Sequence, residues 1–196
     1  MRTPRRSRAV CVLGSAVAIM AAGEGGARAD DTIKHPGDHP TYKVEAEPHL
    51  LLGWDGIFAS GGVGIGARFS IPIVQNGFVD SINNSVAISF GMDIMHYDEC
   101  RWANLGCTAN YFFFPVAMQW NFFVAQRWSV FGEPGLFIYH GFVDDCPPNA
   151  MNCNRPSVNG VRPLIDLGAR YHINENVSLT MRIGWPAFSF GASFFL

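Results

Sequence analysis

The chain has 196 residues, of which 48% are hydrophobic and 15% charged, and its 14 basic and 16 acidic side chains give a formal net charge of −2. This length predicts one domain, large enough for a β-barrel or a β-sandwich. The lack of a basic excess argues against a nucleic acid as partner, because nucleic-acid binding depends on clustered Lys and Arg.

Residues 1–29 have the layout of a secretory signal peptide. Four arginines within the first eight residues precede an apolar run over residues 9–22, and a small-residue stretch ends at Ala29. The arginine pair at residues 5 and 6 leaves twin-arginine export open as an alternative route. The segment holds five arginines and one glutamate, so the remaining chain has 9 basic and 15 acidic residues and a formal charge of −6. We expect cleavage near Ala29 and an exported product.

Residues 30–41 are polar and lack periodicity, which predicts a flexible periplasmic tail. His35, Asp38 and His39 have metal-ligating side chains, but histidines in a solvated segment are more often unbound. Beyond residue 29, every apolar run is shorter than the ~18 residues that a membrane helix needs. If the chain enters a membrane, we expect it to do so as strands.

From residue 42 onward, apolar and polar side chains alternate with a period of two, which is typical of strands with one apolar face. In the first strand Leu50 and Leu52 share one face, and Glu45 and Glu47 share the other. The alternation predicts eight strands, at residues 42–54, 59–73, 86–94, 112–124, 128–138, 161–173, 178–185 and 188–196. Short turns near residues 126 and 174–176 are expected on the periplasmic side, and the long segments 98–110 and 142–159 on the outer side.

The alternation alone does not say which face points outward, because a soluble lipocalin-like barrel would place its apolar face inside. A soluble barrel needs many charged side chains on its surface, yet only two lysines follow residue 29. The apolar faces also carry large aromatic side chains of the kind that form belts at membrane interfaces. The expected belt consists of Trp54, Trp120, Trp128, Tyr171 and Trp185. We therefore predict an all-β, eight-stranded, antiparallel, up-and-down transmembrane β-barrel.

The polar strand faces, which we assign to the lumen, carry five basic and five acidic side chains. They are Lys43, Arg68, Arg162, Arg170 and Arg182, and Glu45, Glu47, Asp93, Glu133 and Asp166. An eight-stranded barrel is only wide enough for side chains to fill it, and buried charges persist where they are paired. We therefore expect an ion-pair network that plugs the barrel.

Four cysteines beyond the signal segment form two pairs of equal spacing, Cys100 with Cys107 and Cys146 with Cys153. An even number of cysteines in an exported chain favours disulfides, and local pairing is the simplest connectivity. A zinc site made of all four is the alternative, although the spacing is wider than that of usual thiolate ligands.

Residues 42–196 resemble the small outer-membrane β-barrel proteins of diderm bacteria, the class with OmpA-type and OmpX-type barrels. Phe188, Phe190 and Phe194 match the alternating aromatic ending of that class, whereas Leu196 replaces its final Phe. The resemblance implies an outer-membrane location, with membrane lipid and the barrel-insertion machinery as partners. It covers no catalytic motif, and we expect no catalytic residue, cofactor or metal.

These features predict a non-enzymatic protein whose stapled outer loops serve envelope stability or surface recognition. A narrow pore or lateral gate is the first alternative, if Phe123, Phe131, Phe137 and Tyr139 line a continuous cavity. A lipid-modifying enzyme is the second, and a soluble lipocalin-like barrel the third. The second would use His96 or His140 as the base, with Ser89 or Ser129 as the nucleophile.

Overall fold

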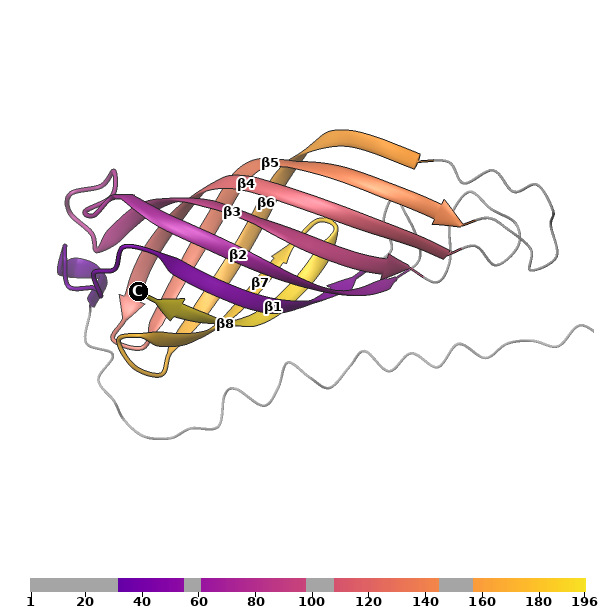
Figure 1. The fold of residues 1–196 in the computed structure, drawn as a ribbon. Helices are drawn as coiled ribbons and strands as arrows, with labels where there is room; N and C mark the ends of the chain where they lie inside the picture. Colours follow the sequence, from indigo (N-terminus) through magenta and orange to yellow (C-terminus); the bar gives the residue numbers. More distant parts are fainter. Residues whose placement is uncertain (1–31, 55–60, 98–107, 145–156) are drawn as a thin grey trace, which may run out of the picture.

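The computed structural model describes residues 32–54, 61–97, 108–144 and 157–196. These residues form one closed barrel in which each strand pairs antiparallel with the next and the last pairs with the first (Figure 1). The strands are β1 (Glu45–Gly53), β2 (Gly62–Val74), β3 (Asn84–Tyr97), β4 (Thr108–Ala125), β5 (Trp128–Asp144), β6 (Ser157–His172), β7 (Val177–Gly184) and β8 (Ala187–Phe195). The predicted up-and-down topology is confirmed.

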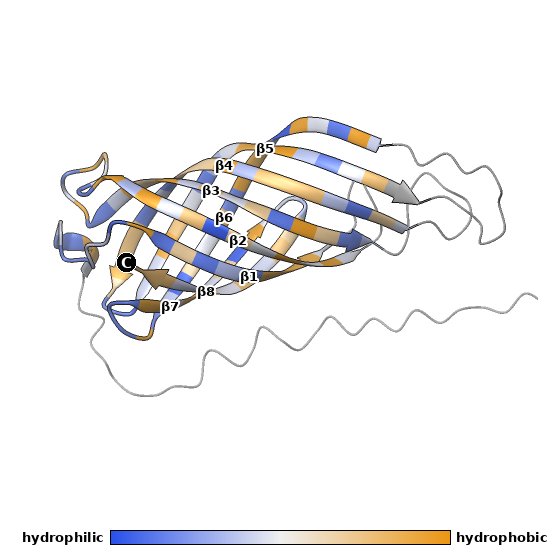
Figure 2. Cartoon of the chain, viewed as in Figure 1, coloured by the Kyte–Doolittle hydropathy of each residue, from blue (hydrophilic) through white to orange (hydrophobic). Residues whose placement is uncertain are grey.

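The apolar face of the barrel wall points outward. In β1 the side chains of Glu45 and Glu47 are 1% exposed, whereas Leu50 is 60% exposed. The same alternation continues around the barrel, and Figure 2 shows it as alternating hydropathy along the strands. An exterior of Leu, Ile, Val and Phe is suited to hydrocarbon and not to water. The soluble lipocalin-like alternative is therefore wrong, because its apolar face would have to line the interior.

The wall of the barrel has unequal height. Strands β4, β5 and β6 contain 18, 17 and 16 residues, whereas β1, β7 and β8 contain nine, eight and nine. In Figure 1 the hairpin of β7 and β8 ends well short of the far ends of β4 to β6. The predicted strands at 112–124, 128–138 and 161–173 were too short at these outer ends. Pairing extends them, because polar residues such as Asn110 and Asn159 stay in register with Phe142 and His140.

At the opposite end, which the sequence analysis assigns to the periplasm and which we call the periplasmic end, residues 75–83 connect β2 and β3. Asn84 organises this connection, since its side chain accepts a hydrogen bond from the Phe78 N–H and donates to the carbonyl oxygens of Val79 and Ile82. Gly77 has a positive φ of 57°, and a Cβ there would collide with the Asn84 side chain. These contacts hold together a connection that is longer than a tight turn.

Residues 32–41 are packed against the periplasmic end, where the sequence predicted a flexible tail. A short 3-10 helix, η2 (Thr32–Lys34), begins the segment. The N–H of Asn83 donates to the Ile33 carbonyl, and its side chain donates to the Asp38 carbonyl, both at 2.7 Å. The His39 ring stacks on Phe123 with ring centroids 4.6 Å apart. The polar composition of this segment gives no signal for these specific contacts.

The residues just before β1 are joined to residue 196 at the same rim. The Leu196 carbonyl accepts hydrogen bonds from the N–H groups of Lys43 and Val44, at 2.7 and 3.1 Å. The Tyr42 ring lies against Phe195, and burial raises the pKa of this phenol above its usual range.

In the part of the chain that the structure describes, none of the helices has the length and apolar composition of a membrane span.

Candidate functional site

Arg182 of β7 joins carboxylates from two distant strands inside the barrel. Its Nε donates to Glu133 Oε2 of β5 at 2.9 Å, and its Nη2 donates to Glu47 Oε2 of β1 at 2.9 Å. A further bond from Nη1 to Glu47 makes that contact bidentate. All three side chains are at most 2% exposed. Bidentate, charge-assisted pairs of this kind are the strongest hydrogen bonds available to side chains.

Arg68 of β2 extends this network to a second acidic side chain. Its Nη1 lies 3.3 Å from Glu133 Oε2, and its Nη2 lies 3.6 Å from Asp93 Oδ2. His49 Nε2 lies 2.9 Å from Asp93 Oδ1, and Gln119 donates to Glu133 Oε1 at 2.7 Å. His49 and Gln119 were not included in the predicted network. Their place on the polar strand faces was the signal that could have identified them.

Arg170 of β6 forms a second cluster nearer the periplasmic end. It lies 2.8 Å from Glu45 Oε1 and donates to Asn121 Oδ1 at 2.6 Å. Its guanidinium also stacks over Phe131, 4.3 Å from the ring centroid, and Arg182 lies 5.0 Å from the same centroid. Phe131 therefore separates the two cationic groups and contacts both of them.

Eight of the ten predicted lumen charges are buried inside the barrel, at most 7% exposed. Asp166 is one of them and borders a small cavity together with Arg68, Asp93 and Arg182. The other two are less buried. Lys43 precedes β1 and is exposed, and Arg162 is half-buried toward the outer end of β6. The alternation placed both on the lumen side, but it carries no information about height along the barrel.

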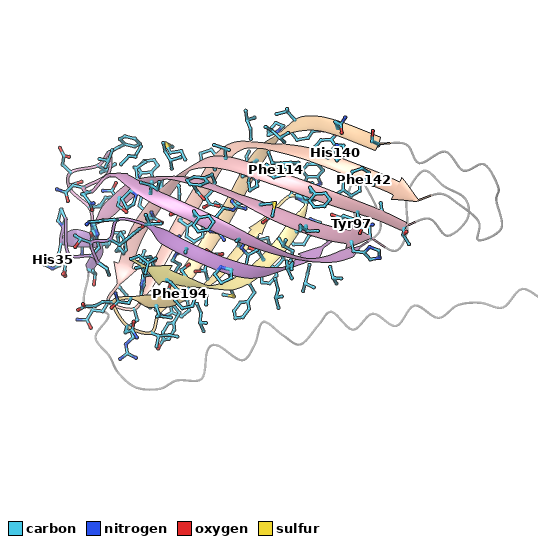
Figure 3. All side chains as sticks on the ribbon, viewed as in Figure 1. His35, Tyr97, Phe114, His140, Phe142 and Phe194 are labelled. Carbon is cyan, nitrogen blue, oxygen red and sulfur yellow. The ribbon has the colours of Figure 1, made fainter. Side chains whose placement is uncertain are left out.

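Aromatic side chains fill the outer half of the lumen. Tyr97, Tyr111, Phe113, Phe137 and Tyr139 are all buried, and their rings contact one another. In Figure 3 Tyr97 lies toward the outer end of the barrel, and His35 lies at the opposite end. The cavity between this aromatic layer and the charged layer has a volume of about 30 Å³. Such a volume holds only about one or two water molecules.

The four aromatic residues proposed as a pore lining lie at different levels. Phe123 stacks on His39 at the periplasmic end, and Phe131 lies beneath the two guanidinium groups. Phe137 and Tyr139 belong to the outer aromatic layer. They do not line one continuous cavity.

Four of the five predicted belt aromatics lie on the outside of the wall. Trp54 and Trp128 are each 38% exposed, Tyr171 contacts Trp128, and Trp120 donates to Asn84 Oδ1 at 2.9 Å. Trp185 is the exception, because it lies in the turn between β7 and β8 and packs on Phe137 over the lumen. The turn interrupts the alternation that would have placed Trp185 on the exterior.

The residues considered for catalysis are not arranged as nucleophile and base. His96 is exposed and hydrogen-bonds Asn110, and His140 hydrogen-bonds Asn159. Ser129 is fully buried and pairs with His172 Nε2 at 3.0 Å, a contact that the sequence did not reveal. Ser89 is also fully buried. In the described ranges, no group of three or more His, Cys, Asp or Glu side chains is placed to hold a metal.

The predicted signal segment and the cysteines Cys100, Cys107, Cys146 and Cys153 lie outside the described residues. Their cleavage and pairing therefore stay predictions.

No protein-family model and no curated protein matches this chain. Solved structures do match its fold. Ail, the attachment invasion locus protein of Yersinia pestis, in complex with the heparin analogue sucrose octasulfate, aligns with a TM-score of 0.51 and 11% identity, over 80% of this chain and 98% of that chain. Neisserial surface protein A aligns with a TM-score of 0.51 and 11% identity, over 78% of this chain and 96% of that chain. These matches show that the chain has the fold of the small, eight-stranded outer-membrane β-barrels, and its apolar exterior is suited to a membrane.

Proposed function

We propose that this chain is a non-enzymatic outer-membrane barrel with a closed lumen, whose outer loops act in surface recognition or envelope stability. The observation that carries the proposal is the filled interior. Arg182 bridges Glu47 and Glu133 across the barrel, and an aromatic layer lies above that bridge. Solute passage would require water in place of these contacts. Removing one partner of a buried ion pair costs about 3–5 kcal/mol because it leaves an uncompensated charge, so a substitution in this network should be clearly destabilising.

The uneven wall supports a role for the outer loops. Segments 98–107 and 145–156 follow β3 and β5, and the strands that flank them, β3 to β6, are the longest in the barrel. Each segment contains one of the cysteine pairs, and we infer a local disulfide in each. A short cross-linked loop on a tall wall loses little conformational entropy on binding, which favours recognition.

The ligand class of the matched Ail complex is not carried over to this chain. Segments 55–60, 98–107 and 145–156 together contain four acidic and two basic residues. A sulfated polyanion requires a basic surface. We therefore infer a different ligand for these loops.

Complementation of a deletion strain tests the role of the loops. One strain carries the full chain, and another carries a version with segments 98–107 and 145–156 replaced by short Gly-Ser turns. We expect the second version to insert as a folded barrel and to fail in restoring adhesion or detergent resistance. Full restoration by the loop-replaced chain would overturn the proposal and place the function in the wall or lumen.

The same strains test the enzymatic alternative. The variants His96→Ala and His140→Ala leave the loops and the lumen network intact, and we expect both to restore the phenotype fully. If these two variants failed to restore the phenotype while the loop-replaced chain restored it, the result would instead support a lipid-modifying activity.

A further inference from the structure

An apolar groove lies on the outside of the barrel near its periplasmic rim. It has a volume of about 250 Å³ and is lined by Trp128, Ala169, Tyr171, Leu179, Met181 and Phe190. These residues are contributed by four consecutive strands, β5 to β8, and they adjoin one another in the strand register. We call this feature the periplasmic-side groove.

The groove exists because a small side chain lies among large ones. Ala169 is opposite Met181 on the neighbouring strand, and Met181 is opposite Phe190 on the next. Trp128 and Tyr171 form the side nearest the rim, with ring centroids 5.1 Å apart. An empty apolar groove loses dispersion contacts along its lining, so a flexible hydrocarbon chain is the natural occupant in a membrane.

One cationic side chain is fixed at the rim end of this groove. Arg127, in the turn between β4 and β5, is exposed, and its Nη1 donates to the hydroxyl of Tyr171 at 3.3 Å. Its own backbone carbonyl accepts a hydrogen bond from the His172 N–H at 2.8 Å, which anchors the turn. Tyr171 therefore belongs to the groove and also positions the guanidinium. A guanidinium at the membrane interface matches a phosphate group in charge and hydrogen-bond geometry.

We propose that the periplasmic-side groove binds one phospholipid of the periplasmic leaflet, with an acyl chain along the groove and the phosphate at Arg127. The site combines an apolar slot with an adjacent cation, whereas a plain lipid-facing wall offers only a surface. The proposal concerns the exterior of the barrel, so it does not depend on the loops or on the closed lumen.

Native mass spectrometry of the refolded full chain in detergent tests this site with two probes. The first is phosphatidylglycerol, and the second is diacylglycerol with the same acyl chains but no phosphate. We expect the wild-type chain to retain one phosphatidylglycerol more strongly than diacylglycerol. Arg127→Gln should reduce phosphatidylglycerol retention about fivefold, the usual effect of one basic side chain near a membrane surface, and leave diacylglycerol unchanged. Ala169→Leu should reduce retention of both lipids by filling the groove.

Two matched controls separate the site from general effects. Lys43→Gln removes another exposed cation at the same end, and Ala67→Leu enlarges another outward-facing alanine, on β2. Both should retain lipid as the wild type does. If Ala169→Leu does not fold, Arg127→Gln with the two probes decides alone. Equal retention by the wild type and both site variants would overturn the proposal. A stable dimer that is lost in Ala169→Leu, without retained lipid, would also overturn it and assign the groove to a second copy of the chain.

Discussion

Glu133 on β5 lies directly opposite Asp166 on β6, and both carboxylates are buried in the lumen. Like charges at opposite positions of neighbouring strands destabilise a sheet unless other groups compensate. Glu133 accepts hydrogen bonds from Arg68, Gln119 and Arg182, whereas Asp166 borders the small cavity beside them. The two acidic side chains therefore contribute differently to the hydrogen-bond network inside the barrel.

Substitution of these two residues should have unequal effects on stability. Glu133→Gln leaves two buried guanidinium groups without their shared carboxylate, and we expect a loss of about 3–5 kcal/mol. Asp166→Asn removes the like charge opposite Glu133, and we expect a change of at most about 1 kcal/mol in either direction. Urea unfolding of each variant refolded in vesicles, monitored by the gel mobility of unboiled samples, measures its free energy of unfolding. Equal losses in the two variants would contradict the assigned roles.

Gly77→Ala should destabilise the periplasmic connection between β2 and β3. The added methyl group would displace the Asn84 side chain, and the positive φ of residue 77 is unfavourable for alanine. We expect a loss of more than about 1 kcal/mol in the free energy of unfolding. Gly132→Ala is the matched control, because a Cβ at Gly132 meets only Leu167 at 3.9 Å. Urea unfolding should separate the two variants. A larger loss in Gly132→Ala would argue against the Asn84-centred connection.

His39→Ala should loosen residues 32–41 from the periplasmic mouth. The variant loses the stacking on Phe123 and the hydrogen bond between His39 Nε2 and the Gln75 carbonyl. We expect faster hydrogen exchange at the N–H of Asn83, which donates to the Ile33 carbonyl of this segment. His35→Ala is the control, since its ring is exposed, and should exchange as the wild type does. No difference between the two variants would mean that the His39 contacts do not hold the segment.

The four cysteines beyond the signal segment should be oxidised in the exported protein. Peptide mapping without reduction is expected to find Cys100 joined to Cys107 and Cys146 joined to Cys153. Free thiols, or a chain that binds stoichiometric zinc through them, would refute this pairing.

The sequence predicted the fold and the two faces of the wall because both follow from a period of two. Leu50 and Glu47 were assigned to the correct sides without any knowledge of their neighbours. The strand ends were less predictable, because Asn110 and Asn159 have the composition of loop residues and are held in strands by cross-strand pairing.

Contacts across the barrel were beyond prediction from the pattern. Alternation places a side chain in the lumen, but the height and tilt of the strands decide which other side chain it meets. Arg182 therefore could be assigned to the lumen, whereas its joint contact with Glu47 and Glu133 could not. For the same reason the pairing of Ser129 with His172 and the inward packing of Trp185 emerged only from the structure.

Recording from the refolded chain in planar bilayers tests the central claim, the closed lumen, most directly. Flotation with vesicles and a mobility shift on unboiled gels would first establish that the chain has inserted as a folded barrel. The filled interior predicts no stepwise conductance from the wild-type chain at neutral pH. Stable, reproducible conductance steps from that inserted chain would contradict it and favour a narrow pore.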